Sequence, residues 1–301
     1  MRTAFSDTFC AAAAKDERLA LVLADIFAAG SMLDFRREHP KRVVNTGVAE
    51  QIMIGMCAGM AMRGLRPFAY SIATFALFRP YEFVRDDLCY QGLPVTVVGV
   101  GGGVTYAQLG GTHHAMEDVA LACAIPNMRV IAPCDPQETR AATAWCAHQN
   151  DGPVYLRLGK AGEPDLSADA PEPWRFGKVR YLRGGREACV IGYGPILKLA
   201  MEATKGQDVA VVSVHTMKPL DIDGLGTILR RYPLVVVLEE MVARGGLGEA
   251  VRSLAYEINA RCAIEHISLK DKFIHIYGTH ADVLAAHGIT EEAVREKING
   301  A

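Results

Sequence analysis

Short apolar runs alternate with longer segments of helical periodicity over the first 160 residues. The clearest run is 19–24, which is apolar at every position and ends at Asp25. Such a run is typical of a parallel strand that is buried on both faces. Similar runs predict further strands at 43–44, 66–71, 95–100, 128–132 and 154–157. The segments between them predict helices at 6–15, 52–62, 81–89, 116–123 and 136–148.

The pattern is interrupted between Gly159 and Trp174 by a polar, Pro-rich stretch that is typical of a linker. A second alternation follows, with strands expected at 188–191, 209–214, 234–238 and 263–267 and a helical tail to 301. The chain is therefore predicted to be an α/β protein with two consecutive three-layer domains, each with a mostly parallel sheet. The expected boundaries are 1–160 for the first domain, 161–184 for the linker and 185–301 for the second domain.

Composition narrows the class of protein. Of 301 residues, 22% are charged and the net charge is −2, with no basic stripe for nucleic acid and no polybasic run for a membrane. No secretory signal pattern opens the sequence, and the apolar runs are too short to span a bilayer. Eight scattered cysteines without paired spacing favour buried free thiols and a cytoplasmic location. Neither common Gly-rich nucleotide motif occurs.

Glu50 is the first candidate for chemistry. It follows the short strand at 43–44 and a Gly turn, and it precedes a very apolar helix. A lone acid at that place could cap the helix, because negative charge is favourable near a helix N-terminus. The same place is the carboxyl end of a strand, where open α/β sheets bind ligands. Position alone leaves both interpretations open.

Two groups of residues further along the chain are also candidates for the site: an aromatic group and a pair of histidines. Phe75, Phe78 and Tyr81 recur every three residues, close to one helical face, although such a stripe is more often core than binding site. His113 and His114 follow a Gly-rich segment. Because adjacent side chains point in different directions, at most one of the two is expected to face a given site.

Together the motifs resemble the C-terminal half of a transketolase, in that family's order and over nearly the whole chain. The resembling segments are Asn-Thr-Gly-Val-Ala-Glu-Gln at 45–51, Thr-Phe-Ala-Leu-Phe-Arg-Pro-Tyr-Glu at 74–82, Gly-Gly-Thr-His-His at 110–114, Ile-Pro-Asn-Met at 125–128, Ala-Pro-Cys-Asp-Pro at 132–136, Met-Lys-Pro-Leu-Asp at 217–221, Glu-Glu at 239–240 and Gly-Gly-Leu-Gly at 245–248. The resemblance implies a pyrimidine-binding domain of a thiamine diphosphate enzyme followed by a transketolase C-terminal-like domain.

The resemblance also implies roles for the candidates. Glu50 would hydrogen-bond the aminopyrimidine ring of the cofactor and favour the tautomer that removes the thiazolium proton. Phe78 is the first choice for stacking on that ring, with Phe75 and Tyr81 as neighbouring walls. His113 matches the active-site histidine of the family, which lies near the reacting carbon and contacts substrate oxygens.

Half of the family's cofactor site has no counterpart in this sequence. The diphosphate half carries Gly-Asp-Gly and an Asn pair that bind a divalent metal, and Gly-Asp-Gly does not occur here. No metal ligand is therefore assigned to this chain. The resemblance implies a partner, an N-terminal-half transketolase subunit that holds the diphosphate and Mg²⁺, in an α2β2 assembly.

The substrate end departs from the family pattern at four positions. Leu109 replaces an Asp that contacts the donor's hydroxyl, Gly101 replaces a His near the sugar phosphate, and Met241 replaces a His of the second domain. Lys160 stands for the phosphate-binding Arg, keeping the charge but losing the bidentate fork. Lys160 and His113 are the candidate substrate contacts. The expected substrate is a modified, branched or unphosphorylated sugar, or another ketol donor.

The leading hypothesis is a subunit that transfers a two-carbon ketol unit from a ketose to an aldose. Three alternatives stay open: a 1-deoxyxylulose-5-phosphate synthase-like activity, a 2-oxo acid dehydrogenase β-type subunit, and a non-catalytic partner subunit that has kept the fold. The sequence assigns no role to Asp25, Gln51 or His114.

Overall fold

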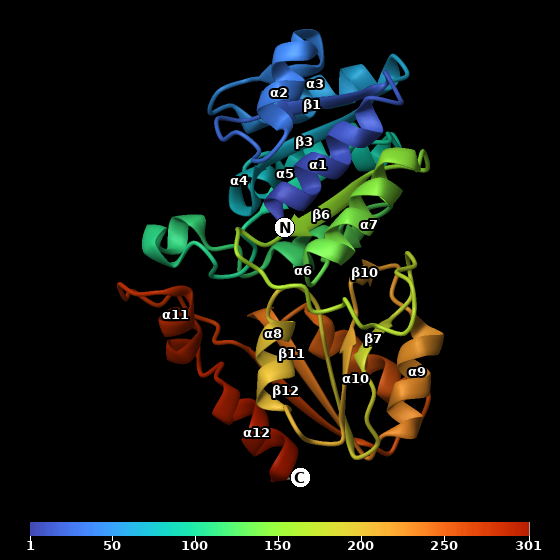
Figure 1. Ribbon diagram of the computed structural model, residues 1–301, viewed down its shortest axis with the longest axis vertical. Helices are drawn as coiled ribbons and strands as arrows, with labels where there is room; N and C mark the ends of the chain where they lie inside the picture. The colour runs from blue at the N-terminus through green and yellow to red at the C-terminus, as the bar shows by residue number, and fades with distance from the viewer. Residues whose placement is uncertain (301) are drawn as a thin grey trace.

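The computed structural model describes residues 1–300. It has two lobes, each a sheet between helices, with the first half of the chain (blue to green) above the second (yellow to red) in Figure 1. The first sheet has seven strands in the order β10-β5-β6-β4-β3-β1-β2. Six of them are parallel: β1 (Leu19–Leu23), β2 (Val43–Asn45), β3 (Arg66–Ile72), β4 (Thr96–Val100), β5 (Arg129–Ile131) and β6 (Val154–Leu158).

Helices cover both faces of this sheet. β1, β3, β4 and β6 are buried at every position, as expected for mainly apolar parallel strands covered on both faces. One face packs on α1 (Arg2–Ala13) and α7 (Pro136–His148), and the other on α3 (Glu50–Met62), η2 (Val84–Tyr90) and α6 (Asp118–Ala124). The remaining elements are short: α2 (Met32–Glu38), η1 (Pro40–Arg42), α4 (Ala73–Leu77), α5 (Tyr81–Phe83), η3 (Ala107–Leu109) and η4 (Gly111–His113).

The second sheet has five strands in the order β12-β11-β8-β9-β7. Its strands are β7 (Arg180–Arg183), β8 (Ala188–Gly192), β9 (Val209–Ser213), β11 (Leu234–Val242) and β12 (Ala263–Leu269), and only β7 is antiparallel among the residues described. Its helices are α8 (Leu197–Ala203), α9 (Ile222–Arg231), α10 (Leu247–Glu257), α11 (His280–His287) and α12 (Glu291–Asn299). The predicted architecture of two α/β domains is confirmed.

Two short strands were not predicted from the sequence pattern. β7 lies inside the segment expected to be linker, so the first strand of the second sheet begins before residue 185. β10 (Thr216–Lys218) comes from the second half of the chain yet pairs antiparallel with β5 in the first sheet. The Lys218 ammonium group also donates to the carbonyls of Cys123 and Ile125, at 2.8 and 2.6 Å. The two domains are therefore joined by a shared sheet edge.

Two expected helices differ in detail. The helix expected at 81–89 starts as α5 and continues as η2, whose turns are of the wider π type. The tail expected to be helical contains α11 and α12, but residues 270–279 before them are irregular until Thr279 caps α11 through a reciprocal bond with Asp282. Over residues 1–300, the helices lack the combination of length and apolar character that a bilayer crossing needs.

Candidate functional site

The residues singled out from the sequence gather at the carboxyl edge of the first sheet. Glu50 follows β2, Phe75 follows β3, His113 follows β4 and Lys160 follows β6. The chain runs from β1 outward to β2 and then returns to β3 on the other side of β1. Open α/β sheets bind ligands outside such a switch in strand order. The topology therefore places these four residues where a ligand is expected.

Glu50 is the first residue of α3 and only 1% of it is exposed. Its carboxylate accepts a hydrogen bond from Arg79 at 2.7 Å, in an ion pair with the guanidinium. The N-cap position is Ala49, which makes no side-chain capping bond. The carboxylate of Glu50 thus reaches across to the turn after α4, which a helix cap does not do.

Aromatic contacts extend this ion pair toward His113. The Arg79 guanidinium lies over the Phe75 ring, 4.4 Å from its centre. The Phe75 ring meets the His113 ring edge to face, with centres 5.1 Å apart. A continuous set of contacts therefore links Glu50, Arg79, Phe75 and His113. Arg79 was missed by the sequence interpretation, and its signal was its position inside the aromatic motif.

Phe78 and Tyr81 lie differently from Phe75. Both are partly buried and pack against the apolar cluster under α3 and α6. The Tyr81 hydroxyl donates to the carbonyl of Leu121 at 3.0 Å, and burial raises the pKa of this hydroxyl. Their assignment as walls of a pyrimidine site stays a prediction.

The two adjacent histidines have different surroundings. The Nδ1 atom of His113 lies 3.0 Å from the Thr112 hydroxyl, and partial burial lowers the pKa of His113. His114 is only 5% exposed, and burial lowers its pKa as well. Its Nε2 atom has no hydrogen-bond partner among residues 1–300. At neutral pH both rings are therefore uncharged, and it is His113 that faces Phe75.

The loop that carries His113 is held by the second domain. Gly103 and Ala115 form a bridge that closes the loop at its base. Next to this bridge, the Val104 amide donates to the buried Glu240 carboxylate at 2.7 Å, and His280 meets the same oxygen at 2.7 Å. Burial by itself would raise the pKa of Glu240, but the nearby His280 and Arg157 outweigh it, and the pKa is lowered. Burial by itself would lower the pKa of His280, but the Glu240 carboxylate outweighs it, and the pKa is raised.

A second buried network lies behind this loop. Arg157 donates from Nε to Asp118 at 2.8 Å and from Nη2 to the carbonyl of Glu240 at 3.0 Å. The Tyr155 hydroxyl donates to the same Asp118 oxygen at 2.8 Å. Arg157 and Asp118 are 3% and 0% exposed. The sequence interpretation missed this network, because its members are far apart along the chain and belong to no motif of their own.

Tyr106 lies beside Gly101, Lys160 and His113. Gly101 has a φ of +73°, and a Cβ atom there would overlap the Tyr106 ring. The Lys160 ammonium group lies 5.0 Å from the centre of this ring, and the His113 ring lies 6.3 Å from it. Tyr106 thus fills the space that a side chain at position 101 would need and separates His113 from Lys160.

The other departures from the family pattern have separate environments. Leu109 is 52% exposed and lines, with residues 274–277, a pocket of about 220 Å³ beside the His113 loop. Met241 is fully buried, and its sulfur accepts a hydrogen bond from the Tyr193 hydroxyl at 3.5 Å. Met241 therefore belongs to the core. Gln51 donates weakly to the Arg79 carbonyl at 3.4 Å, and Asp25 exchanges backbone hydrogen bonds with the Asn45 side chain.

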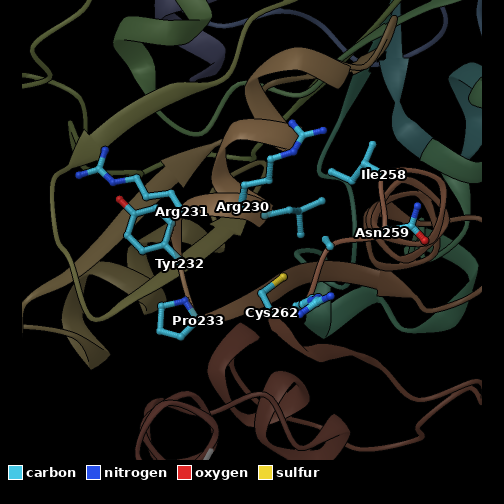
Figure 2. A pocket seen from close by; sticks show the side chains of 10 residues that line it. Arg230, Arg231, Tyr232, Pro233, Ile258, Asn259 and Cys262 are labelled. Carbon is cyan, nitrogen blue, oxygen red and sulfur yellow. The ribbon is translucent and has the colours of Figure 1, made fainter.

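A larger hollow of about 550 Å³ lies elsewhere, at the amino ends of β11 and β12. Its wall includes three arginines, yet Figure 2 shows Arg230 and Arg231 pointing in opposite directions. Ligands of open α/β sheets bind at the other ends of the strands. This hollow therefore lies at the end of the strands opposite to the one where a ligand is expected.

The described residues hold no group of three or more His, Cys, Asp or Glu side chains arranged to bind a metal ion. Whether Mg²⁺ is held by a partner chain stays a prediction.

Fold and site together define a two-domain α/β protein whose ligand edge is organised around one buried carboxylate. Family models match nearly the whole chain, "Transketolase, pyrimidine binding domain" at residues 1–162 and "Transketolase, C-terminal domain" at residues 177–294. The chain belongs to the transketolase family, and the resemblance noted in the sequence is confirmed. This family is thiamine diphosphate-dependent.

Within the family, the chain is similar to proteins that are named as transketolase subunits. It is 30% identical to a subunit of the apulose-4-phosphate transketolase of Phocaeicola vulgatus, with 97% of this chain and 94% of the relative covered. It is 34% identical to the 6-deoxy-6-sulfo-D-fructose transketolase subunit SqwH of Clostridium sp. strain MSTE9, with 97% and 94% covered. It is also 35% identical to a 1-deoxy-D-xylulose-5-phosphate synthase of Syntrophotalea carbinolica, but spans only 47% of that enzyme.

A solved structure titled "Split gene transketolase, inactive beta4 tetramer" has the same fold. Its TM-score is 0.88 at 31% identity, and the match covers 100% of this chain and 97% of the other. The chain is therefore a transketolase-family subunit with the architecture of a split-transketolase β subunit.

Proposed function

We propose that this chain is the β-type subunit of a thiamine diphosphate-dependent transketolase, which moves a two-carbon ketol unit from a ketose to an aldose. The observation that carries the proposal is the buried Glu50 carboxylate at the carboxyl end of β2, linked through Arg79 and Phe75 to His113. One enclosed acid beside aromatic rings, with a neutral histidine close by, suits this cofactor better than it suits a metal or a nucleotide phosphate.

The residues present fit the pyrimidine half of the cofactor. An aminopyrimidine ring needs one hydrogen-bonding partner for its ring nitrogen and flat apolar surface for its faces. Glu50 supplies the carboxylate, and in the structure it already binds a planar N–H donor that lies over Phe75. Phe75 supplies the ring surface, with Phe78 and Tyr81 as further candidates from the same segment.

Each side chain then has a defined task. When bound, thiamine diphosphate supplies the nucleophilic carbon and the electron sink for cleaving the ketose. Glu50 holds and orients the aminopyrimidine by sharing a proton with its ring nitrogen. His113, whose pKa is lowered by burial, is neutral at pH 7 and can accept or return a proton at a substrate oxygen. Phe75 excludes water from the space between Glu50 and His113.

The same proposal includes a partner. Glu50 and its neighbours account for one half of the cofactor, so we infer that a second chain with Gly-Asp-Gly and an Asn pair holds the diphosphate and Mg²⁺. Two relatives are named as subunits, and the β4 tetramer is named inactive, which supports an active assembly of two kinds of chain such as α2β2. A cytoplasmic location belongs to this proposal.

For the substrate, we infer a sugar with an anionic end group near Lys160. The two subunit relatives are named for a sugar phosphate and for a sulfo sugar, both of which are anions. Lys160 is exposed at the end of β6 and lies against Tyr106. This site differs from that of an ordinary transketolase in two ways: Leu109 is uncharged, and the space next to Gly101 is filled by Tyr106.

A synthase activity is the second candidate, because the chain is 35% identical to 47% of a 1-deoxy-D-xylulose-5-phosphate synthase. The two reactions differ in the first substrate. Release of CO₂ from pyruvate would favour the synthase, and ketol transfer from a ketose without CO₂ would favour the transketolase.

The test is to purify the chain alone and together with a chain that carries the missing diphosphate motif. Thiamine diphosphate and magnesium are then titrated into each sample by calorimetry. Tight binding is expected only for the mixture, and tight binding by the chain alone would sink the half-site proposal. A second test screens ketose donors with and without a phosphate or sulfonate group on the wild-type complex and on the Lys160→Met complex. If the wild type requires the anionic group and Lys160→Met does not, Lys160 is supported as the residue that binds it.

A further inference from the structure

Arg79 lies between the two groups proposed for the cofactor ring. One guanidinium nitrogen donates to the Glu50 carboxylate at 2.7 Å, and the guanidinium plane sits over Phe75 at 4.4 Å. No other side chain of residues 1–300 forms a hydrogen bond or an ion pair with the Arg79 guanidinium. The side chain of Arg79 is thus committed to Glu50 and Phe75 together.

A guanidinium group and an aminopyrimidine ring make similar demands on their surroundings. Both are flat, both stack on aromatic faces, and both can donate N–H hydrogen bonds to a carboxylate. A guanidinium on Phe75 and Glu50 therefore uses the same two contacts that the ring requires. The two cannot occupy them at the same time.

We propose that Arg79 is a placeholder, which occupies the position of the aminopyrimidine ring in the unloaded subunit and leaves it when the cofactor binds. This inference rests on the proposed function, because it assumes a thiamine diphosphate site at Glu50. It adds a positioning residue that sets the affinity for the cofactor.

The placeholder has a physical purpose. A carboxylate that is 1% exposed is costly to keep ionised without a partner. Arg79 supplies that partner until the ring arrives, so that Glu50 stays in position at the start of α3. The apolar face of Phe75 is covered at the same time, which limits nonspecific association of the free subunit.

The structure also indicates which partner moves. Glu50 is a buried residue at the start of α3, whereas the Arg79 side chain is 38% exposed and lies on the turn between α4 and α5. Its backbone carbonyl is held by Gln51 at 3.4 Å. The side chain can therefore swing into solvent while the main chain and Phe75 stay in place.

The test measures thiamine diphosphate affinity of the complete complex by calorimetry, with Arg79→Met as the main variant. Methionine keeps an apolar stem but cannot hold the carboxylate. Because displacement of the placeholder no longer opposes loading, the Kd is expected to fall by about tenfold. Arg79→Lys keeps the charge but loses the flat fork, and its Kd is expected to lie between the two.

Two further variants make the result decisive. Arg85→Met removes an exposed arginine of the same segment, which pairs with Asp86, and is expected to leave the Kd unchanged. If Arg79→Met does not fold, Arg79→Gln, whose shorter neutral side chain loses the ion pair with Glu50, is used in its place, and a lower Kd is again expected. Circular dichroism before each titration establishes that the variant is folded.

The outcomes separate this inference from the proposed function. If the wild-type complex does not bind thiamine diphosphate, the proposed function fails and the placeholder fails with it. If the wild type binds but Arg79→Met binds equally or more weakly, the placeholder alone is overturned, and Arg79 is then a group that stays with Glu50 in the loaded enzyme. Tighter binding by Arg79→Met, with Arg85→Met unchanged, supports it.

Discussion

At the scale of single residues, Glu50 and Gly101 mark the two ends of the site. Glu50 is enclosed where α3 begins, and its ion pair with Arg79 keeps a charged group stable in a buried place. Gly101 is in a left-handed conformation against the Tyr106 ring. The proposed function assigns the cofactor ring to Glu50. At Gly101, the Tyr106 ring fills the space that a side chain would need.

Replacing Glu50 by Gln should abolish activation of the cofactor. The amide has nearly the same shape but cannot share a proton with the ring nitrogen in the same way, so exchange of the thiazolium proton should fall by about 100-fold or more. Exchange is measured by NMR on the complex, with Glu82→Gln, an exposed acid of α5, as the matched control. Exchange at the normal rate in Glu50→Gln would remove Glu50 from its role.

Replacing Gly101 by Ala should destabilise the protein by about 2 kcal/mol, because the new methyl group strains a left-handed residue and overlaps Tyr106. The double variant Gly101→Ala with Tyr106→Ala should lose less than the sum of the two single variants, since one clash is removed. Chemical denaturation gives the free energies of unfolding. Strict additivity would show that Tyr106 does not fill this space.

At the scale of elements, the loop 103–115 depends on the second domain. Its base is closed by the Gly103–Ala115 bridge and held by Glu240 of β11, which is itself paired with His280 at the start of α11. η3 within this loop also packs against α11. The position of His113 is thereby linked to elements that carry no candidate catalytic residue.

The Glu240–His280 pair predicts a pH-dependent contribution to stability. Because the pKa of His280 is raised above its ordinary value of 6.5 in the folded protein, its contribution is fully present below pH 6.5 and is lost as the pH rises through the raised pKa. The lowered pKa of Glu240 means that its own contribution is lost only in acid. The free energy of unfolding of His280→Gln should therefore fall below that of wild type by roughly 1 kcal/mol between about pH 5 and 6.5, a value reduced because His280 is partly exposed. In alkali the two proteins should differ little.

The measurement is the denaturation midpoint of His280→Gln and of wild type from about pH 5 to about pH 9. His148→Gln, an exposed histidine of α7, is the matched control. Lys160 and Glu163 also act on His280, in opposite directions, so both remain unchanged in these proteins. A difference that stays constant from pH 5 to pH 9 would contradict the role given to the pair.

At the scale of the whole molecule, the two domains form one structural unit. β10 of the second half completes the first sheet, and the Val242 amide donates to the Met116 carbonyl at 2.9 Å. Arg157 of β6 binds Asp118 in its own domain and the Glu240 carbonyl in the other. We therefore expect the domains to unfold together and to present a single surface to a partner chain.

Arg157→Met should destabilise the protein by about 3–5 kcal/mol, because it leaves the Asp118 carboxylate buried without its cation. One oxygen of Asp118 already lacks a partner among the described residues, and the hydrogen bond that would remain on the other oxygen, from the Tyr155 hydroxyl, brings no positive charge. Chemical denaturation is the measurement. Arg186→Met, which removes an exposed ion pair with Asp208, is the control and should change stability little. Equal effects of the two substitutions would argue against the network.

The sequence by itself determined the fold class and the principal candidates of the site. Apolar runs such as 19–24 must be buried on both faces, and the spacing between them requires helical crossovers, so the α/β class follows from local pattern. The motifs around Glu50 and His113, together with the later motifs in the same order, were sufficient to identify the family. These features depend on residues close together in the chain, and a sequence records such relations directly.

Only the tertiary structure decided how these parts act on one another. Arg79 over Phe75, Tyr106 against Gly101, and Glu240 on Val104 are contacts whose direction no local pattern specifies. Glu240 and Val104 are 136 positions apart, and β10 is too short to be recognised before its partner strand is known. Such contacts form because folding brings distant side chains into one buried space, where hydrogen bonds and charges must be matched.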